Sequence, residues 1–202
     1  MDPSELPYSQ SCENNKHPIL SVLSTSFSRC KQVLEIGSGT GQHATFFANH
    51  LPHLIWQPSD QGIYIQPLTK RIAFEGGDNL NAPLTLEVSQ SWPCDHLNLD
   101  GIFSANTLHI MSMHHVDAFF AGVKQHLSPE GKCCIYGPFN YNKQYTSESN
   151  HQFDIWLKQR DKNSGIRDIE WIIQLASAAG LELAADHEMP ANNRLLEFYK
   201  RA

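Results

Sequence analysis

The sequence predicts an α/β fold: a mostly parallel sheet of seven strands that ends in an antiparallel hairpin, with helices on both faces. Short apolar runs bounded by turn residues alternate with amphipathic stretches, which is the pattern of strands and helices around a parallel sheet. The last two apolar runs are joined by residues 189–194 alone. Because this connection is too short for a crossover helix, the two runs must pair as a hairpin.

The individual elements follow from these runs in chain order. Strands are expected at residues 32–36, 54–57, 84–88, 101–105, 132–136, 181–186 and 195–199. Residues 114–127 carry apolar side chains at helical spacing and should form a helix, which the Ser-Pro-Glu-Gly segment 128–131 ends. A further helix should begin at Asp168, a residue suited to an N-cap, and stop at Gly180, which suits a left-handed C-cap.

Length and composition limit the organisation of the chain. Its 202 residues, 41% of them hydrophobic, suit one domain over 1–202, and the polar segment 1–15 is expected to be a disordered tail or a lid over the site. No apolar stretch reaches the roughly 18 residues of a membrane span, and the N-terminus lacks the features of a signal peptide. The expectation is a cytoplasmic protein with no membrane partner.

Charge and cysteine usage limit the partners. The formal charge of −6 argues against a nucleic acid partner, because phosphate binding needs clustered lysines and arginines. A small-molecule substrate is the simpler expectation, and the oligomeric state is left open. Cys133 and Cys134 are neighbours in one apolar run, so their side chains should point to opposite faces of a strand, and a disulfide framework is not expected. Without a C-x-x-C pair, and with scattered histidines, no metal site is expected.

The most informative segment is 33–43, an apolar run that ends in an acid and then carries Gly37, Gly39 and Gly41. It predicts a strand, a loop whose backbone can approach a ligand closely, and a helix whose free N–H groups face the same spot. A phosphate-binding loop would end in Gly-Lys-Ser/Thr, and the dinucleotide pattern G-x-G-x-x-G would have glycine where Gln42 stands. Both of those ligands are therefore disfavoured. An ordinary glycine-rich turn between a strand and a helix remains the alternative to a nucleotide-type site.

An acid follows the second apolar run. In a doubly wound sheet, ligands bind beyond the carboxyl ends of the strands, and Asp60 lies at such an end. A carboxylate at this point can accept both hydroxyls of a ribose. The alternative is a helix N-cap, because Ser59 and Asp60 precede an expected helix.

The pattern E-x-G-x-G-x-G, Asp60 and the terminal hairpin together resemble the class I S-adenosylmethionine-dependent methyltransferases, which have a Rossmann-like fold. Almost the whole chain is similar to one group of small proteins among them, the methyltransferase-like 26 family. The similarity runs through residues 15–20, 37–43, 56–60, 106–110, 136–139, 165–168 and 189–193. It implies S-adenosylmethionine as the cofactor and methyl transfer as the activity. It supplies no substrate.

The resemblance also implies which residues hold the cofactor. Glu87 and Val88 end the third run, where this class cups adenine between a polar group and a hydrocarbon; a plain strand end is the alternative. Asn106 follows the fourth run and should wall the methionine side. The full set of expected cofactor contacts is Glu35, Gly37, Gly39, Thr40, Gly41, His43, Asp60, Gln61, Glu87, Val88 and Asn106.

Catalytic groups are harder to assign, because in-line methyl transfer depends mostly on positioning and a base is optional. His109 follows the segment that should face the methyl group, so it is the first candidate to take a proton, and Asp154 is the second. A structural hydrogen bond is the alternative role for His109.

Expected substrate contacts lie in the segments that should cover the carboxyl edge of the sheet. They are Tyr136, Phe139, Tyr145, Asn150, Arg167 and Asn192. The loop 137–150 should be a substrate lid or an ordinary surface loop. Arg167 should clamp an acidic substrate or pair with Asp168 to orient the adjacent helix. Two functions stay open: an enzyme that methylates a small molecule, and a non-catalytic module that binds the nucleoside and acts through a protein partner.

Overall fold

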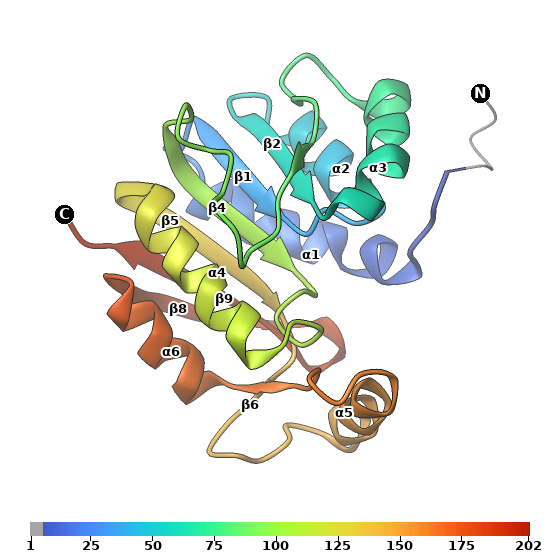
Figure 1. Cartoon of the computed structure of the whole chain (residues 1–202), viewed down its shortest axis with the longest axis vertical. Coiled ribbons are helices and arrows are strands. Elements are labelled where there is room, and N and C mark those ends of the chain that lie inside the picture. Colours follow the sequence, from blue (N-terminus) through green and yellow to red (C-terminus); the bar gives the residue numbers. More distant parts are fainter. Residues whose placement is uncertain (1–5) are drawn as a thin grey trace.

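The computed structural model describes residues 6–202 of the chain, and Figure 1 shows its arrangement. Seven strands form one sheet in the order β3-β2-β1-β4-β5-β9-β8. They are β1 (Gln32–Ile36), β2 (Ile55–Asp60), β3 (Leu84–Thr85), β4 (Leu99–Ala105), β5 (Leu127–Gly137), β8 (Leu181–Met189) and β9 (Asn193–Lys200). The first five pair in parallel, and β9 pairs antiparallel with both β5 and β8. The predicted mostly parallel sheet with a terminal hairpin is confirmed.

Helices cover both faces of the sheet, as predicted. They are α1 (Gln10–Ser26), α2 (Gln42–His50), α3 (Gly62–Glu75), α4 (Met113–His126), α5 (Glu148–Arg160) and α6 (Ile169–Ala178), and a short 3-10 helix spans Pro190–Asn192. Buried side chains of α1 and α2 form the core on one face, and those of α4 and α6 form the core on the other. A separate pair of short strands, β6 (Phe139–Asn140) and β7 (Arg167–Asp168), lies beside α5.

The adjacent cysteines of β5 confirm the expected alternation of a strand. Cys133 packs in the core beneath α4 and α6, whereas Cys134 packs in the core beneath α1 and α2. All five cysteines of the chain are free thiols. β5 is therefore buried on both faces, which is typical of a parallel strand between two helical layers.

Several predicted boundaries were wrong. The expected strand 84–88 pairs with β2 only over β3, because the chain then bends away from the sheet. Residues 128–131 belong to β5, which begins at Leu127 opposite Leu99 of β4. The segment 10–15, expected as part of an arm or lid, forms the start of α1.

The early start of α1 has a local cause. Ser9 is the N-cap, and its hydroxyl accepts a hydrogen bond from the backbone N–H of Cys12, while Glu13 places an acid in the first turn. Residues 1–5 of the expected arm lie outside the described residues. Within residues 6–202, no helix combines the length and the apolar character that crossing a bilayer requires.

Candidate functional site

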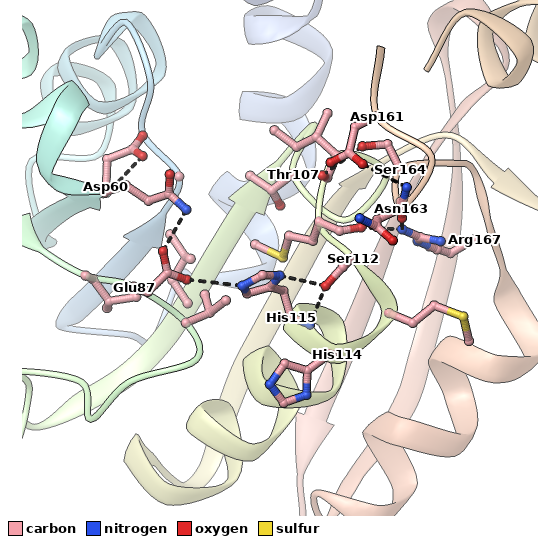
Figure 2. A pocket seen from close by; sticks show the side chains of 18 of the residues that line it. Asp60, Glu87, Thr107, Ser112, His114, His115, Asp161, Asn163, Ser164 and Arg167 are labelled. Atoms are coloured by element: carbon pink, nitrogen blue, oxygen red, sulfur yellow. Dashed lines mark hydrogen bonds and ion pairs between the residues drawn. The ribbon is translucent and has the colours of Figure 1, made fainter. Parts of the chain in front are cut away.

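A cavity of about 820 Å³ opens at the carboxyl ends of the parallel strands, and we call it the large cavity. One wall comes from the glycine loop and the ends of the first strands and contributes Gly37, Asp60 and Glu87. The facing wall comes from the segment between β4 and α4 and from residues 158–167. Figure 2 shows Asp60 and Glu87 on one side and Arg167 on the other. Both the place and the volume suit a small-molecule or cofactor site.

Packing requires two glycines of the loop. Gly37 has a φ of +77°, and a Cβ at this position would stand 2.5 Å from Cγ2 of Thr107. Gly41 has a φ of +78° at the N-cap of α2, and its Cβ would stand 2.8 Å from Cδ1 of Leu68. The loop can therefore turn tightly from β1 into α2, which directs the free N–H groups of α2 toward the ligand-binding edge of the sheet.

Asp60 ties the glycine loop to the end of β2. Its Oδ2 accepts a hydrogen bond of 2.6 Å from the backbone N–H of Gly39, and its Oδ1 accepts one of 2.7 Å from that of Gln61. Burial raises the pKa of this carboxyl. Gln61, rather than Asp60, occupies the N-cap position of α3. A carboxylate offers about four lone-pair sites, so Asp60 can still accept two hydrogen bonds from a ligand.

A row of polar side chains continues from Asp60 across the large cavity (Figure 2). Nε2 of Gln61 donates to Oε2 of Glu87 over 2.8 Å, and Nε2 of His115 lies 3.8 Å from Oε1 of Glu87. Nδ1 of His115 is 2.6 Å from the hydroxyl of Ser112, which also caps α4. Val88 lines the cavity next to this row. The cavity thus offers acids and apolar surface side by side.

Sequence reasoning missed His115 and Ser112, and also Tyr64 and Met111 of the same lining. Ser112 had a signal, because a serine just before a helical pattern predicts an N-cap. His115 had none. It fell inside the predicted helix 114–127, whose pattern identifies the core face and leaves the other faces unassigned.

Six predicted cofactor residues lie outside the lining of the large cavity: Glu35, Gly39, Thr40, Gly41, His43 and Asn106. Glu35 is 2% exposed and accepts a hydrogen bond of 2.9 Å from Nε1 of Trp56. Nε2 of His43 lies 2.6 Å from Oδ1 of Asn15, and burial lowers the pKa of this histidine to about 4. The carbonyl oxygen of Thr40 accepts a hydrogen bond from an arginine of α3. These side chains support the loop, and their contact with a cofactor stays a prediction.

A second cavity, of about 330 Å³, lies between α1, the end of β4 and α5. We call it the amide-lined cavity, because its lining includes Asn14, Asn15, Asn106, Asn150 and Asn193. Tyr136 also lines it, so the structure brings three of the predicted residues together here. Asn192 lies beside it: its carbonyl oxygen accepts a hydrogen bond of 3.0 Å from Nδ2 of Asn150, and the residue lines a separate hollow.

Asp154 is a buried hydrogen-bond centre. Its Oδ2 accepts from the hydroxyl of Tyr145 over 2.7 Å and from Nζ of Lys158 over 2.5 Å, and its Oδ1 accepts from the N–H of Ile166 over 2.7 Å. Burial alone would raise the pKa of Asp154, but the hydrogen bonds from these groups outweigh it and lower the pKa. Asp154 and Tyr145 therefore hold α5 to the segment before β7. Neither lines either cavity.

His109 and Arg167 belong to one packed corner. The His109 ring lies edge-to-face on Phe153 at 5.3 Å, and burial, with a smaller contribution from Arg167, lowers the pKa of His109 to about 4. The Arg167 guanidinium donates to the carbonyl oxygens of Leu108 and Met111. Within residues 6–202 it makes no ion pair, so the expected pairing with the neighbouring acid was wrong.

Phe139, a predicted substrate contact, is 1% exposed and packs in the core beneath α4 and α6. Its backbone pairs with Arg167 in the β6–β7 ladder. The predicted loop 137–150 thus contains a short strand and the start of α5. Across residues 6–202, no cluster of three or more histidine, cysteine, aspartate or glutamate side chains could hold a metal ion.

Comparison with known proteins adds the family. A family model described as "Protein of unknown function (DUF938)" matches residues 6–200. The chain belongs to this family. Solved structures resemble this member of the family in fold alone, because their sequences are less than one fifth identical to it.

Three of those structures represent the likeness. An O-methyltransferase family protein from Burkholderia thailandensis has a TM-score of 0.80 at 16% identity, over 93% of this chain and 56% of its own. The S-adenosylmethionine-dependent methyltransferase SibL, in its apo form, has a TM-score of 0.79 at 17% identity, over 95% and 56%. An O-methyltransferase family 2 protein from Planctomyces limnophilus, in complex with apigenin, has a TM-score of 0.78 at 14% identity, over 94% and 57%. The chain has the class I methyltransferase fold and spans a little over half the length of these proteins.

Proposed function

We propose that the protein is an S-adenosylmethionine-dependent methyltransferase that acts on a small molecule, with the methyl donor in the large cavity. The observation that carries the proposal is the convergence of the glycine loop, Asp60 and Glu87 on one cavity at the carboxyl edge of a class I methyltransferase sheet. A generic glycine-rich turn would not need two acids and an apolar strip around the same opening.

The residues of the large cavity fit the parts of this donor. Asp60 has lone pairs left for two ribose hydroxyls, and Glu87 can accept from an exocyclic adenine amine. Val88 and Met111 offer apolar contact to a flat base. When bound, S-adenosylmethionine supplies an electrophilic methyl group: an acceptor lone pair takes the methyl carbon, the C–S electrons return to sulfur, and the acceptor's proton passes to solvent.

On the acceptor side, the chain's own residues are better suited to positioning the acceptor than to taking its proton. Because burial lowers the pKa of His109 to about 4, its imidazole is neutral at neutral pH and is a weak proton acceptor. Asp154 already accepts from Tyr145, Lys158 and Ile166. We therefore infer that proximity and orientation supply most of the rate acceleration and that neither residue is an obligatory base.

A pH profile tests this inference. Between about pH 5 and about pH 8 the rate of methyl transfer should show no inflection that disappears in a His109→Gln variant, because a histidine with a pKa near 4 does not titrate in that range. A wild-type inflection near pH 6.5, the ordinary histidine value, that is absent from the variant would make His109 the base.

The finer family assignment is part of the same proposal. The segments that resemble the methyltransferase-like 26 family run along nearly the whole chain, and the fold neighbours named above include O-methyltransferases. The fold neighbours favour a small-molecule acceptor, and the family resemblance names none. The alternative, a nucleoside-binding module without catalysis, shares the donor site and differs only in lacking the transfer step after the nucleoside binds.

Ligand-induced thermal stabilisation tests the donor. S-adenosylmethionine and S-adenosylhomocysteine at about 100 times their dissociation constants should stabilise the folded protein by about 2.7 kcal/mol, whereas NAD should not shift the melting temperature. Absence of a shift with either sulfur nucleoside would overturn the proposal. Transfer of an isotope-labelled methyl group into a metabolite extract then distinguishes the enzyme from the module, and an extract without labelled product would favour the module.

A further inference from the structure

The amide-lined cavity and the large cavity lie on either side of the chain at the end of β4. Asn106 lines the smaller cavity, and the next residue, Thr107, lines the larger one. Asn106 has a φ of +60°, so the chain turns sharply between the two openings. A molecule in the amide-lined cavity would therefore lie directly beside a donor in the large cavity, on the side of the sheet edge that faces α1.

The chemistry of the two linings differs. Among the described residues, none of those that line the amide-lined cavity carries a formal charge. The large cavity is lined by charged side chains of both signs. The acids are Asp60, Glu87 and Asp161, and the cations are Lys158, Lys162 and Arg167. An ion in the amide-lined cavity would lose hydration without a counter-charge, which costs far more than the transfer of a neutral molecule.

Buried carboxamides in this cavity keep hydrogen-bonding groups available. Asn15 and Asn150 are each 5% exposed. His43 contacts Oδ1 of Asn15, and Nδ2 of Asn150 donates to Thr146 and to a backbone carbonyl. The Asn15 side chain also hydrogen-bonds the hydroxyl of Tyr136, which leaves Oδ1 of Asn150 for a ligand. A ligand with a hydrogen-bond donor could use this oxygen, and the other carboxamides of the lining offer further donors and acceptors.

Flat apolar surfaces complete the lining. Pro138, Phe153 and Pro190 line the cavity, and the Phe153 ring is held by stacking on Trp156 at 5.7 Å. The hydroxyl of Tyr136 lies beside Asn15 and Asn193, and burial raises its pKa, so it stays protonated. Rigid rings and amide groups together suit a compact ring compound that carries hydroxyl or amide substituents.

We propose that the amide-lined cavity is the methyl-acceptor site and that the acceptor is an uncharged ring compound bearing hydroxyl or amide groups. The assignment rests on the proposed function, because it assumes a donor in the large cavity. The competing site for an acceptor is the cationic rim of the large cavity at Lys158 and Lys162, which would take an anion.

Matched probes distinguish the two sites. The isomeric hydroxybenzamides and the corresponding hydroxybenzoates share a ring and a hydroxyl and differ in charge. Their affinities are measured by ligand-observed NMR on the protein saturated with S-adenosylhomocysteine. The hydroxybenzamides should bind about tenfold more tightly than the hydroxybenzoates, because a carboxylate in this cavity would lose hydration without a counter-charge.

Two variants locate the probe. Ser11 is an exposed residue of α1 that lines the amide-lined cavity, and Ser11→Trp should fill its mouth and weaken hydroxybenzamide binding about tenfold. Ser21→Trp, an exposed position of the same helix away from the cavity, is the matched control and should leave binding unchanged. Asn14→Lys adds a cation to the lining and should raise hydroxybenzoate affinity without filling the cavity.

Each outcome bears on one claim. Failure of S-adenosylhomocysteine itself to bind would overturn the proposed function. If it binds, the acceptor site is overturned by tighter binding of the hydroxybenzoates, by equal effects of Ser11→Trp and Ser21→Trp, or by the absence of binding in both probe series. A neutral preference that Ser11→Trp removes, together with a gain of hydroxybenzoate binding in Asn14→Lys, supports it.

Discussion

The large cavity and the amide-lined cavity share one edge of the sheet and differ in the chemistry of their linings. In the large cavity, Asp60 and Glu87 present carboxylates beside apolar side chains, and Asp60 also organises the loop through Gly39. In the amide-lined cavity, carboxamides such as Asn15 and Asn150 present dipoles between rigid rings. Fixed charges suit a nucleoside whose hydroxyls and amine donate, and dipoles suit a neutral partner that both donates and accepts.

Under the proposed function, the two halves of one reaction would lie on the two sides of Asn106. The two cavities also differ in the elements that contribute their residues. The large cavity draws on the ends of neighbouring strands, which the chain visits in a regular order. The amide-lined cavity draws on α1, the end of β4, α5 and the terminal hairpin, which are far apart in the sequence.

The largest expected effect separates packing from conformation in the glycine loop. Gly37→Ala should lower the free energy of unfolding by about 3 kcal/mol, because its Cβ would stand 2.5 Å from Thr107 on a left-handed backbone. Gly39→Ala has the same kind of backbone but no atom within 4 Å of its Cβ, so it should cost only about 1 kcal/mol. Chemical denaturation measures both, and equal losses would contradict the packing role of Gly37.

The next effect tests the charge of the large cavity. Asp60→Asn should weaken S-adenosylhomocysteine binding about a hundredfold, because charge-assisted hydrogen bonds are worth roughly 1.5–3 kcal/mol. Asp117→Asn changes an exposed acid of α4 that lines neither cavity and should leave the affinity unchanged. Calorimetric titration gives both dissociation constants. Similar affinities for the two variants would remove Asp60 from the donor site.

A third change distinguishes an acid that lines the cavity from one buried behind it. Burial raises the pKa of Glu35 to about 7 from its ordinary 4.5, so the folded protein keeps a proton that the unfolded chain gives up. Stability should therefore be fully present below pH 4.5 and fall by on the order of 2 kcal/mol as the pH rises to about 7. Denaturation across this range should show a smaller slope for Glu35→Gln, with unchanged S-adenosylhomocysteine affinity. A slope equal to that of the wild type would contradict the buried acid.

The smallest effect concerns the neutral cavity. Tyr136→Phe removes the hydroxyl that lies beside Asn15 and Asn193 and should weaken hydroxybenzamide binding about five- to tenfold, the loss of one neutral hydrogen bond. Donor affinity should not change, because Tyr136 lies outside the large cavity. Ligand-observed NMR measures the first quantity and calorimetry the second. If the variant lost donor affinity instead, the result would indicate that the two cavities form one site.

Local signals predicted most of the scaffold. The strand 32–36 matches β1 to the residue, and the short 189–194 connection was enough to predict the hairpin. Boundaries failed where local pattern and tertiary pairing diverge. Glu87 and Val88 continue an apolar alternation, yet they leave the sheet after β3 to line the large cavity.

The site was predictable in part, and for a physical reason. Gly37, Asp60 and Glu87 follow strands, so the topology of a doubly wound sheet is enough to predict that they lie close together. Tyr136 and Asn150 were predicted at this edge, whereas Ser11 and Asn14 line the amide-lined cavity only because α1 folds onto the same edge. The spacing of residues in the sequence does not indicate where α1 packs.

A crystal structure of the protein with S-adenosylhomocysteine tests the central claim most directly. We expect the nucleoside in the large cavity, with its ribose hydroxyls on Asp60, its adenine next to Glu87 and Val88, and the amide-lined cavity free of it. A nucleoside seated among Asn15, Asn106 and Asn150 instead, or one that makes no contact with Asp60, would contradict the proposed donor site.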